Sequence, residues 1–555
     1  MANVGVILAS QYVGPKLKPI HNSPFLSIHT EKAMSHLLLV KSVTSGPQAF
    51  FSSTEINGYD LTRDVPLPSI PVLGSWVKNK GYTAGSFDLD RNGHDRLLEE
   101  CSEADVIGFY LNYSGHFSVM DAVERVKKKY PDKLIVIGGP SVMNLREDFY
   151  KLSKPRFLGL IKEKLGNYVD AVVYGEGEIA LETILKYKDN PDEIGRLIDY
   201  GHENSRGIVY KDTKGELHIS TNQGLVSDLS LLPVPSFSLN KDLIPVAFIE
   251  TSRGCAFKCP FCEMPGLYNI RRVKEQKQIE AEINCLQQLG IKHVIITDPA
   301  IYPSKRMDML SEIFAGRGMI WTGYAKPGSW ESSQPLYSKE TLQKARDSGC
   351  ISLFFGGESA CERTQQMYSK PRLEVLRKTE KICKDVGLLS CWSFMILNPG
   401  ETSQDVDKLI DLLIEMNPEM TVFSPFTVMP DAEMGKHPDK YNLRITDPDY
   451  KLKAAELWAR FSKSAGVDKK KKIRHLIENH PQLMRFFLKF MLRKADYFRC
   501  IETGLGLSDG AFEMLRLDAA LNRKTNIKAG KSNYHLIFEM AATNKSDDIV
   551  LPAAN

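Results

Sequence analysis

The chain has 555 residues, of which 43% are hydrophobic and 25% charged, as expected for a globular protein of several domains. Its net charge of +4 gives no whole-chain argument for nucleic-acid binding, and no apolar run approaches the ~20 residues of a membrane span. The short apolar run at the N-terminus has no basic region before it. We therefore expect no signal peptide, a cytoplasmic location and no disulfides.

The first part of the chain alternates between strand-like and helix-like patterns. We predict a first strand at Val4–Leu8, an otherwise irregular stretch to residue 70, and helices over 72–80 and 119–129. Further strands are predicted at 83–88, 104–110, 134–140 and 171–178. Apolar strands separated by helices indicate a parallel sheet covered on both faces. Residues 1–195 are therefore predicted to form a doubly wound, Rossmann-like α/β domain.

Glycines stand where two of these strands end. They are Gly138, Gly139, Gly175 and Gly177. Ligands of parallel sheets bind at the carboxyl ends of the strands, and a residue without Cβ lets the backbone approach a ligand closely. No G-x-G-x-x-G pattern is present, so a dinucleotide site is not expected. The alternative is that these glycines only make tight turns from strand to helix.

The rest of the chain divides into three predicted regions. Residues 196–245 form a connector that contains a hairpin around Lys214-Gly215. Residues 246–430 contain six strand–helix units, which favour a partial (β/α)6 barrel with its active site at the carboxyl ends of the strands. Residues 431–555 are expected to be mostly helical, either packed on the barrel mouth or lying on a membrane, with a disordered tail. The six predicted barrel strands are 247–251, 293–298, 321–326, 352–358, 391–397 and 421–425.

Three cysteines with the spacing C-x3-C-x2-C follow the first of these strands. Cys255, Cys259 and Cys262 lie in a loop tight enough to point three thiolates at one centre. Thiolates hold iron–sulfur clusters, and a four-iron cluster with three cysteine ligands has one iron left open. The alternative is a zinc site with a fourth ligand from elsewhere, but the nearest downstream histidine, His293, lies far outside the usual zinc spacing.

The cysteine motif, with Phe261 before its last cysteine, resembles the signature of radical S-adenosylmethionine (SAM) enzymes. In that family the open iron of a [4Fe-4S] cluster binds SAM. An electron then cleaves SAM to a 5′-deoxyadenosyl radical, which abstracts a hydrogen atom from the substrate. The resemblance implies an electron donor such as flavodoxin or ferredoxin. It also implies SAM contacts from Phe261, Asp298, Glu358, Ser359 and Lys370.

Two short motifs carry the SAM side of this resemblance. Gly356-Gly357-Glu358-Ser359 resembles the family's G-x-E-S-G stretch, although Ala360 replaces its last glycine. Pro399-Gly400-Glu401-Thr402 resembles the P-G-E-T of the cobalamin-binding subgroup, although Leu397 stands where a glycine is usual. A plainer interpretation of Glu401 is that it caps the following helix, because carboxylates favour helix N-termini.

The first domain in turn resembles the cobalamin-binding domain that precedes many radical SAM domains. The resemblance rests on Ile137-Gly-Gly-Pro and on Tyr174-Gly-Glu-Gly-Glu, in the family's order and spacing. The cobalt-ligating D-x-H-x-x-G motif is absent, so His116 is open as a ligand, a hydrogen-bonding group or a helix-start residue. The cobalamin contacts implied are Tyr113, Ser114, His116, Gly138, Gly139, Gly175, Glu176 and Gly177.

These resemblances imply an enzyme that transfers methyl from methylcobalamin to an unactivated carbon of a small-molecule or natural-product substrate. The first alternative is a radical cyclase or ring-rearranging enzyme that transfers no methyl group. A second is a binding module that uses cobalamin or the cluster as a sensor. We expect no nucleic-acid partner and assign no catalytic side chain.

Overall fold

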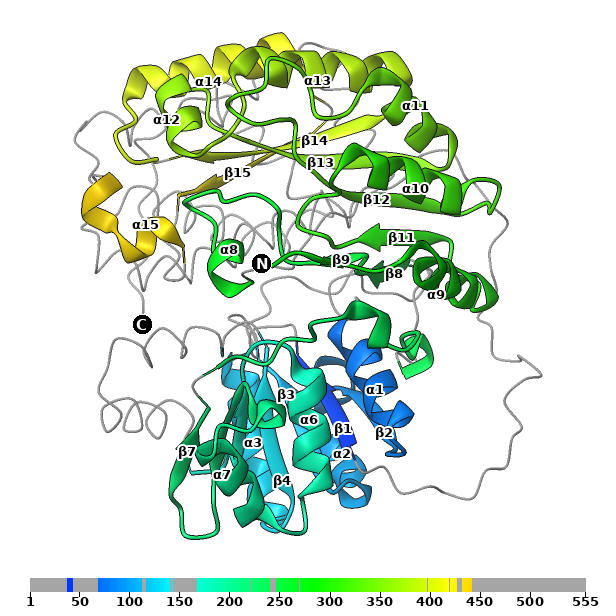
Figure 1. The fold of residues 1–555 in the computed structure, drawn as a ribbon, viewed down its shortest axis with the longest axis vertical. Coiled ribbons are helices and arrows are strands. Elements are labelled where there is room, and N and C mark those ends of the chain that lie inside the picture. The colour runs from blue at the N-terminus through cyan, green and yellow to red at the C-terminus, as the bar shows by residue number, and fades with distance from the viewer. Residues whose placement is uncertain are drawn as a thin grey trace, which may run out of the picture.

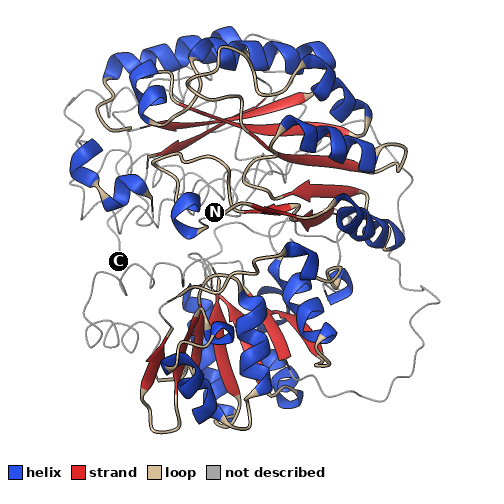
Figure 2. Ribbon diagram, in the orientation of Figure 1, coloured by secondary structure: helices blue, strands red, loops and turns tan. Residues whose placement is uncertain are grey.

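The computed structural model describes residues 37–42, 68–111, 116–139, 142, 167–220, 222–239, 246–268, 270–396, 398–418, 420–426 and 432–441. Within these ranges the chain forms two α/β units, each built around one sheet (Figure 1). Helices flank the strands of both units (Figure 2). The predicted order of a doubly wound domain followed by an open, parallel strand–helix unit is confirmed.

The first sheet has seven strands in the order β2-β1-β3-β4-β5-β6-β7. They are β1 (Leu37–Lys41), β2 (Ala84–Asp88), β3 (Val106–Tyr110), β4 (Leu134–Gly138), β5 (Ala171–Val173), β6 (Ile208–Lys211) and β7 (Leu217–Ile219). Strands β1 to β5 run parallel, and β6 and β7 add an antiparallel hairpin. From β1 the chain passes to β2 on one side of that strand, and it then passes to β3 on the other side. This order creates a switch point between β1 and β3, where such sheets bind ligands.

Both faces of this sheet are buried, because its strands carry apolar side chains on both sides. Helices α1 (Ser69–Asn79) and α6 (Gly177–Lys186) share one core with Leu37 and Val106. Helices α2 (Leu89–Glu100) and α3 (His116–Lys129) share the other core with Leu38 and Ile107. Burying one such side chain stabilises the fold by ~1.5–3 kcal/mol, which explains why the strand sequences are apolar throughout. Helix α7 (Pro191–Asp199) lies against β6 and β7.

Three sequence predictions for this unit need correction. The strand expected over 171–178 ends at Val173, and Gly177 and Glu178 are the first residues of α6. The stretch to residue 70 was expected to be irregular after a strand at 4–8, but 37–41 forms β1, a central strand of the sheet. The segment 4–8 lies outside the described residues. The connector 196–245 does contain the predicted hairpin, but β6 pairs with β5, so 208–219 belongs to the first sheet.

The second sheet has six parallel strands in chain order, β8-β11-β12-β13-β14-β15. They are β8 (Val246–Ile249), β11 (His293–Ile296), β12 (Ile320–Ala325), β13 (Cys350–Glu358), β14 (Leu389–Ile396) and β15 (Met420–Pro425). Each agrees with a strand predicted from the sequence. No pairing joins β15 to β8 in the part of the chain that the structure describes, so the barrel is open.

Helices cover one face of the second sheet. They are α9 (Gln276–Gln288), α10 (Ser304–Phe314), α11 (Lys339–Asp347), α13 (Leu373–Val386) and α14 (Ser403–Met416). Their apolar sides form one core with strand residues such as Trp321, Phe355 and Trp392. In Figure 1, α11, α13 and α14 lie on the side of the sheet away from the first unit.

Short elements complete the described chain. Strands β9 (Ser252–Arg253) and β10 (Arg272–Val273) pair antiparallel, with α8 (Met264–Leu267) between them. Helices α12 (Glu362–Met367) and α15 (Glu433–Lys436) follow β13 and β15. Short 3-10 helices span Cys101–Glu103, Glu203–Ser205, Leu229–Leu231, Phe237–Leu239 and Pro438–Tyr441. The predicted helical region beyond 441 lies outside the described residues, and no described helix has the length and apolarity needed to traverse a bilayer.

Candidate active site

The three cysteines of the motif lie in the loop that joins β9 to β10. Cys255 and Cys262 are partly exposed and Cys259 is buried. The amide of Cys262 donates to the carbonyl of Cys259 at 3.0 Å, which closes a turn between them. The antiparallel pair β9–β10 closes the loop at its base, with Arg253 opposite Arg272. The loop is therefore held at both ends by backbone pairing.

The thiols of this loop lie close enough to affect one another. Burial, together with the neighbouring thiols of Cys259 and Cys255, raises the pKa of Cys262 to about 12. The pKa of Cys255 is also raised, mainly by burial. Binding to a metal centre would stabilise the thiolate form of these side chains.

A cluster and a single metal ion need their ligands in different arrangements. Over the described ranges, no three His, Cys, Asp or Glu side chains converge closely enough to hold one metal ion. A structural zinc site needs four ligands around one point, whereas the thiolates of an iron–sulfur cluster each bind a different iron. The choice of a cluster therefore rests on the spacing of the three cysteines.

Asp298 holds the start of the cysteine loop through hydrogen bonds. It follows β11 and is fully buried. One of its oxygens accepts from the amides of Thr251 at 2.6 Å and Ser252 at 3.0 Å, and the other accepts from both hydroxyls at 2.6 Å. Both oxygens are thus engaged by the chain itself. This geometry argues that Asp298 orders the loop, in place of the SAM contact expected from the sequence.

A lysine that the sequence did not single out lies beside the cysteines. Lys326 directly follows β12, and its ammonium lies 3.9 Å from the Cys259 sulfur and 4.0 Å from the Phe257 ring centre. It also donates to the carbonyl of Ser369 at 3.2 Å. Burial lowers the pKa of Lys326, while Cys259 opposes that shift. No local motif marks this residue, but its place at the carboxyl end of a barrel strand was a usable signal.

Glu358 and Lys370 form a buried ion pair at the same edge of the sheet. Glu358 ends β13, and its carboxylate lies 2.7 Å from the Lys370 ammonium. Burial alone would lower the pKa of Lys370, but Glu358 and Cys259 raise it above its ordinary value. Glu358 has a φ of 63°, a left-handed conformation that is uncommon for a residue with a side chain. Strained residues of this kind cluster at functional sites.

A chain of contacts connects the P-G-E-T stretch to the cysteine loop. The Glu401 carboxylate accepts from the Ser359 hydroxyl and, at 3.3 Å, from the Asn398 amide. The Asn398 side chain accepts from the Tyr368 hydroxyl at 2.7 Å. The Tyr368 ring in turn packs against Phe261, with 4.7 Å between centres. Three of the predicted SAM-side stretches are thus in one connected cluster.

The interpretation of Glu401 as a helix cap is wrong. Helix α14 is capped by Thr402, whose side chain and amide form a capping box with Asp405. The Thr402 amide donates to Asp405 at 2.9 Å. The sequence held this signal, since Thr402 and Asp405 have capping-box spacing.

The residues predicted to bind cobalamin spread over several strand ends of the first sheet. Gly138 ends β4, at the level of Tyr110 on β3. Tyr113 and Ser114 lie outside the described residues. His116 begins α3, which agrees with a helix-start residue, but its side chain is not described.

The glycines after β4 and β5 face other parts of the chain. Gly139 has a φ of 112°, and a Cβ there would lie 2.6 Å from the Leu111 carbonyl. Gly175 has a φ of 93°, and a Cβ there would lie 2.6 Å from the Gly224 carbonyl. At both positions a side chain would collide with the protein's own backbone, so the fold requires glycine there whether or not a ligand binds. Gly177 begins α6.

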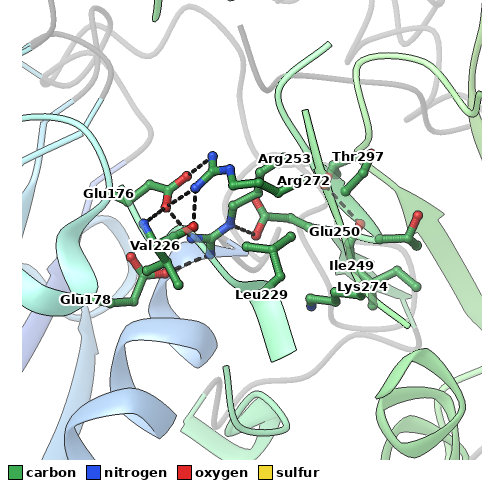
Figure 3. Close-up of polar contacts among 12 residues, drawn as sticks. Glu176, Glu178, Val226, Leu229, Ile249, Glu250, Arg253, Arg272, Lys274 and Thr297 are labelled. Carbon is green, nitrogen blue, oxygen red and sulfur yellow. Dashed lines mark hydrogen bonds and ion pairs between the residues drawn. The ribbon is translucent and has the colours of Figure 1, made fainter. Parts of the chain in front are cut away.

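Glu176 points at the second unit (Figure 3). Its oxygens lie 2.6 Å from Nη2 of Arg272 and 3.1 Å from Nη1 of Arg253, and it also accepts from the Val226 amide at 2.6 Å. These contacts occupy the Glu176 carboxylate, which argues against a cobalamin contact from that group. Sequence reasoning missed both arginines, although Arg253 stands two residues before the first cysteine.

Comparison with known protein families identifies the family that this site matches. The profile of the radical SAM superfamily matches residues 249–413, which include the cysteine loop and the ends of β8 and β11 to β14. The chain carries a radical SAM domain. It is therefore an enzyme whose cofactors include a [4Fe-4S] cluster and SAM, as predicted from the cysteine motif.

Relatives extend the similarity beyond the radical SAM domain. An uncharacterised methyltransferase of Pyrococcus horikoshii is 22% identical over 70% of this chain and 85% of its own length. An anaerobic magnesium-protoporphyrin IX monomethyl ester cyclase of Rubrivivax gelatinosus is 22% identical over 68% of this chain and 67% of its own.

Among solved structures, the cobalamin-dependent SAM radical enzyme OxsB matches 92% of this radical SAM chain and 84% of its own, with a TM-score of 0.61 and 14% identity. The methyltransferase TsrM of Kitasatospora setae matches 72% and 75%, with a TM-score of 0.56 and 16% identity. At these identities the structures establish a shared two-unit fold.

Proposed function

We propose that this radical SAM enzyme also binds cobalamin and transfers a methyl group to a small-molecule substrate. One observation carries the proposal: the carboxyl end of β5 in the first sheet contacts the base of the cysteine loop through Glu176 and Arg253. A cofactor over the first sheet and SAM on the cluster would therefore lie at facing edges. The methyltransferase and the cobalamin-dependent enzymes among its matches support this arrangement.

The cluster side of the proposed site is built from the second sheet. Cys255, Cys259 and Cys262 would each bind one iron and leave the fourth open to SAM. Glu358 and Lys370 are suited to hold the polar groups of SAM, because each is buried and already forms a short ion pair. Phe261 and Ser359 complete this side through the Tyr368 and Glu401 contacts. When bound, the cluster and SAM supply the radical that abstracts hydrogen.

The cobalamin side would be centred on the switch point of the first sheet. In this order of strands, a ligand binds where β1 and β3 end. The described groups at that edge include Ser42 after β1 and Leu111 after β3. Gly138 lies on the next strand, and we retain it, Tyr113, Ser114 and His116 as proposed contacts. Gly139, Gly175 and Gly177 shape the backbone around this edge.

The cyclase among the relatives keeps a second function open. A radical cyclase would use the same cluster and SAM without transferring a methyl group. The two functions differ in their SAM products, because methyl transfer converts one SAM to S-adenosylhomocysteine while radical formation yields 5′-deoxyadenosine. The electron donor and the small-molecule substrate stay proposals in both cases.

The test uses the anaerobically reconstituted full chain with cobalamin, SAM, a chemical reductant and candidate metabolites. We expect one cobalamin bound per chain, and both S-adenosylhomocysteine and 5′-deoxyadenosine formed with a substrate whose mass rises by one methylene unit. Formation of 5′-deoxyadenosine with product but without S-adenosylhomocysteine would establish the cyclase-type function. Failure to bind cobalamin would contradict both the proposed cofactor and the role of the first sheet.

A further inference from the structure

A buried charge network connects the two units at the base of the cysteine loop. Arg253 lies 2.7 Å from Glu178 through Nη2 and 3.1 Å from Glu250 through Nε. Arg272 bridges both oxygens of Glu176, with 2.6 Å and 2.9 Å between the paired atoms. Figure 3 shows Glu176 and Glu178 approaching from the first unit, and the two arginines approaching from the second.

The arginines occupy matched positions in the fold. Arg253 is in β9 and Arg272 in β10, and they are paired residues of that two-stranded ladder. The whole loop 254–271, with its three cysteines, lies between them. Both ends of this loop therefore depend on side chains that insert among carboxylates of the first unit. Arg272 also donates to the Val226 carbonyl, and Gln223 to the Leu267 carbonyl, which adds two contacts to the same junction.

This network is a poor way to gain stability. Glu176, Glu178 and Arg253 are all at least nine-tenths buried, and desolvating such charges costs as much as the pairing returns. Within the described residues, Glu178 Oε2 and Arg272 Nε have no hydrogen-bond partner. Apolar side chains of similar size would hold two units together at least as well. What a bidentate guanidinium–carboxylate pair adds is a fixed orientation, because its planar groups match in only one way.

We propose that Glu176 and Glu178 are positioning residues that fix the cysteine loop relative to the first unit through Arg272 and Arg253. The Tyr174-Gly-Glu-Gly-Glu stretch then serves as a docking element for the cluster loop. The consequence for catalysis rests on the proposed function: the network would set how cluster-bound SAM faces the cofactor of the first sheet. The positioning itself can be measured without turnover.

The first experiment is hydrogen–deuterium exchange on the full chain with its cluster reconstituted. Glu176→Gln removes the charge that both arginines contact, and Arg272→Lys keeps the positive charge but loses the planar fork. We expect amides in 250–274 to exchange at least about tenfold faster in both variants, with the rest of the chain unchanged. The control is Glu182→Gln, further along α6, whose partners Trp76 and Lys80 lie in its own unit. It should leave 250–274 unchanged.

The outcomes of this experiment separate positioning from general stability. The proposal would be overturned if Glu176→Gln folds and its amides in 250–274 exchange at the same rate as in the parent protein. A uniform acceleration over the whole chain in Arg272→Lys would also overturn it, because the network would then be an ordinary source of stability. Faster exchange confined to 250–274 would support it.

A second measurement tests the consequence for catalysis. We expect Glu176→Gln and Arg272→Lys to retain iron and to form more 5′-deoxyadenosine per product than the parent, by at least about threefold, because misaligned radicals are quenched without product. An unchanged ratio alongside faster loop exchange would overturn the catalytic consequence. If no methylated product forms with any substrate while the exchange result holds, the proposed function fails and the positioning role stands.

Discussion

The ammonium of Lys326 lies 3.9 Å from the sulfur of Cys259. Both groups are buried, so their interaction is weakly screened by solvent. A reduced cluster carries more negative charge than an oxidised one, and a fixed cation beside it favours reduction. This places the charge of Lys326 among the factors that set the reduction potential of the cluster.

Removing that charge should therefore make the cluster harder to reduce. We expect Lys326→Met to shift the midpoint potential downward by about 50–100 mV, equivalent to ~1–2 kcal/mol for one electron. Redox titration monitored by electron paramagnetic resonance measures the shift. The control Lys344→Met removes an exposed lysine of α11, whose side chain is 66% accessible, and should leave the potential unchanged. Equal potentials in parent and Lys326→Met, with full iron content, would contradict the prediction.

The motif cysteines should be essential for iron binding and the other thiols should not. We expect the triple variant Cys255→Ala, Cys259→Ala, Cys262→Ala to lose the brown chromophore and all formation of 5′-deoxyadenosine. Cys285→Ala is the matched control, because this thiol is partly exposed but lies on α9 outside the loop. Iron analysis after anaerobic reconstitution checks both. A triple variant that keeps a four-iron cluster would rule out the assigned ligands.

Asp298 should be needed for the loop more than for SAM. An asparagine at this position would offer one acceptor oxygen in place of two, so we expect Asp298→Asn to destabilise the protein by about 2–3 kcal/mol. Urea unfolding of the apoprotein measures this, and iron content should fall as the loop loses order. Asp385→Asn, an exposed position on α13, serves as the control. A variant with normal stability and iron but weak SAM binding would restore the original prediction of a SAM contact.

Glu358 should show the opposite behaviour. Glu358→Gln keeps the shape of the side chain and removes one charge-assisted hydrogen bond, which costs ~1.5–3 kcal/mol, or about ten- to a hundredfold in SAM affinity. Equilibrium binding of SAM to the reconstituted protein measures the change, and iron content should persist. The exposed Glu362 on α12 gives the control variant Glu362→Gln. Normal SAM binding in Glu358→Gln would remove this residue from the site.

The capping box of α14 predicts a pH-dependent effect on stability. Burial raises the pKa of Asp405, but Lys408 and the Thr402 amide and hydroxyl outweigh it and lower the pKa overall. A carboxyl whose pKa is lower in the folded state stabilises the fold at pH values above its unfolded-state pKa of about 3.9. This contribution is lost as the pH falls through the folded-state pKa. We expect Asp405→Asn to cost about 1 kcal/mol at pH 7 and progressively less below about pH 4.

Chemical denaturation of the apoprotein at several pH values checks this. A cost that does not change between neutral and acidic pH would show that the charge of Asp405 is irrelevant to the cap. Asp385→Asn is an unsuitable control here, because Lys381 and Lys339 lower the pKa of that carboxyl as well. The exposed Asp439 gives the control variant Asp439→Asn.

The sequence was most informative where a local pattern decides the structure. The six strands of the second sheet were predicted because each is an apolar run between amphipathic helices. β1 was missed although Leu37–Lys41 is also a short apolar run, because a run of this length cannot be told from a buried helical segment until its pairing with β2 and β3 is known. The cysteine motif marked its loop through spacing alone. The arginine network could not be found that way, since the partners of Arg253 and Arg272 are remote in sequence.

That remoteness also sets the order in which the junction can form during synthesis. Arg253 follows Glu178 by 75 residues, and Arg272 follows Glu176 by 96. At ~5–20 residues per second, the ribosome delivers each arginine on the order of 5–20 seconds after its acidic partner. For that interval both carboxylates must remain hydrated on a sheet that can already have formed. The nascent first unit therefore displays an acidic docking face before the cluster loop emerges to meet it.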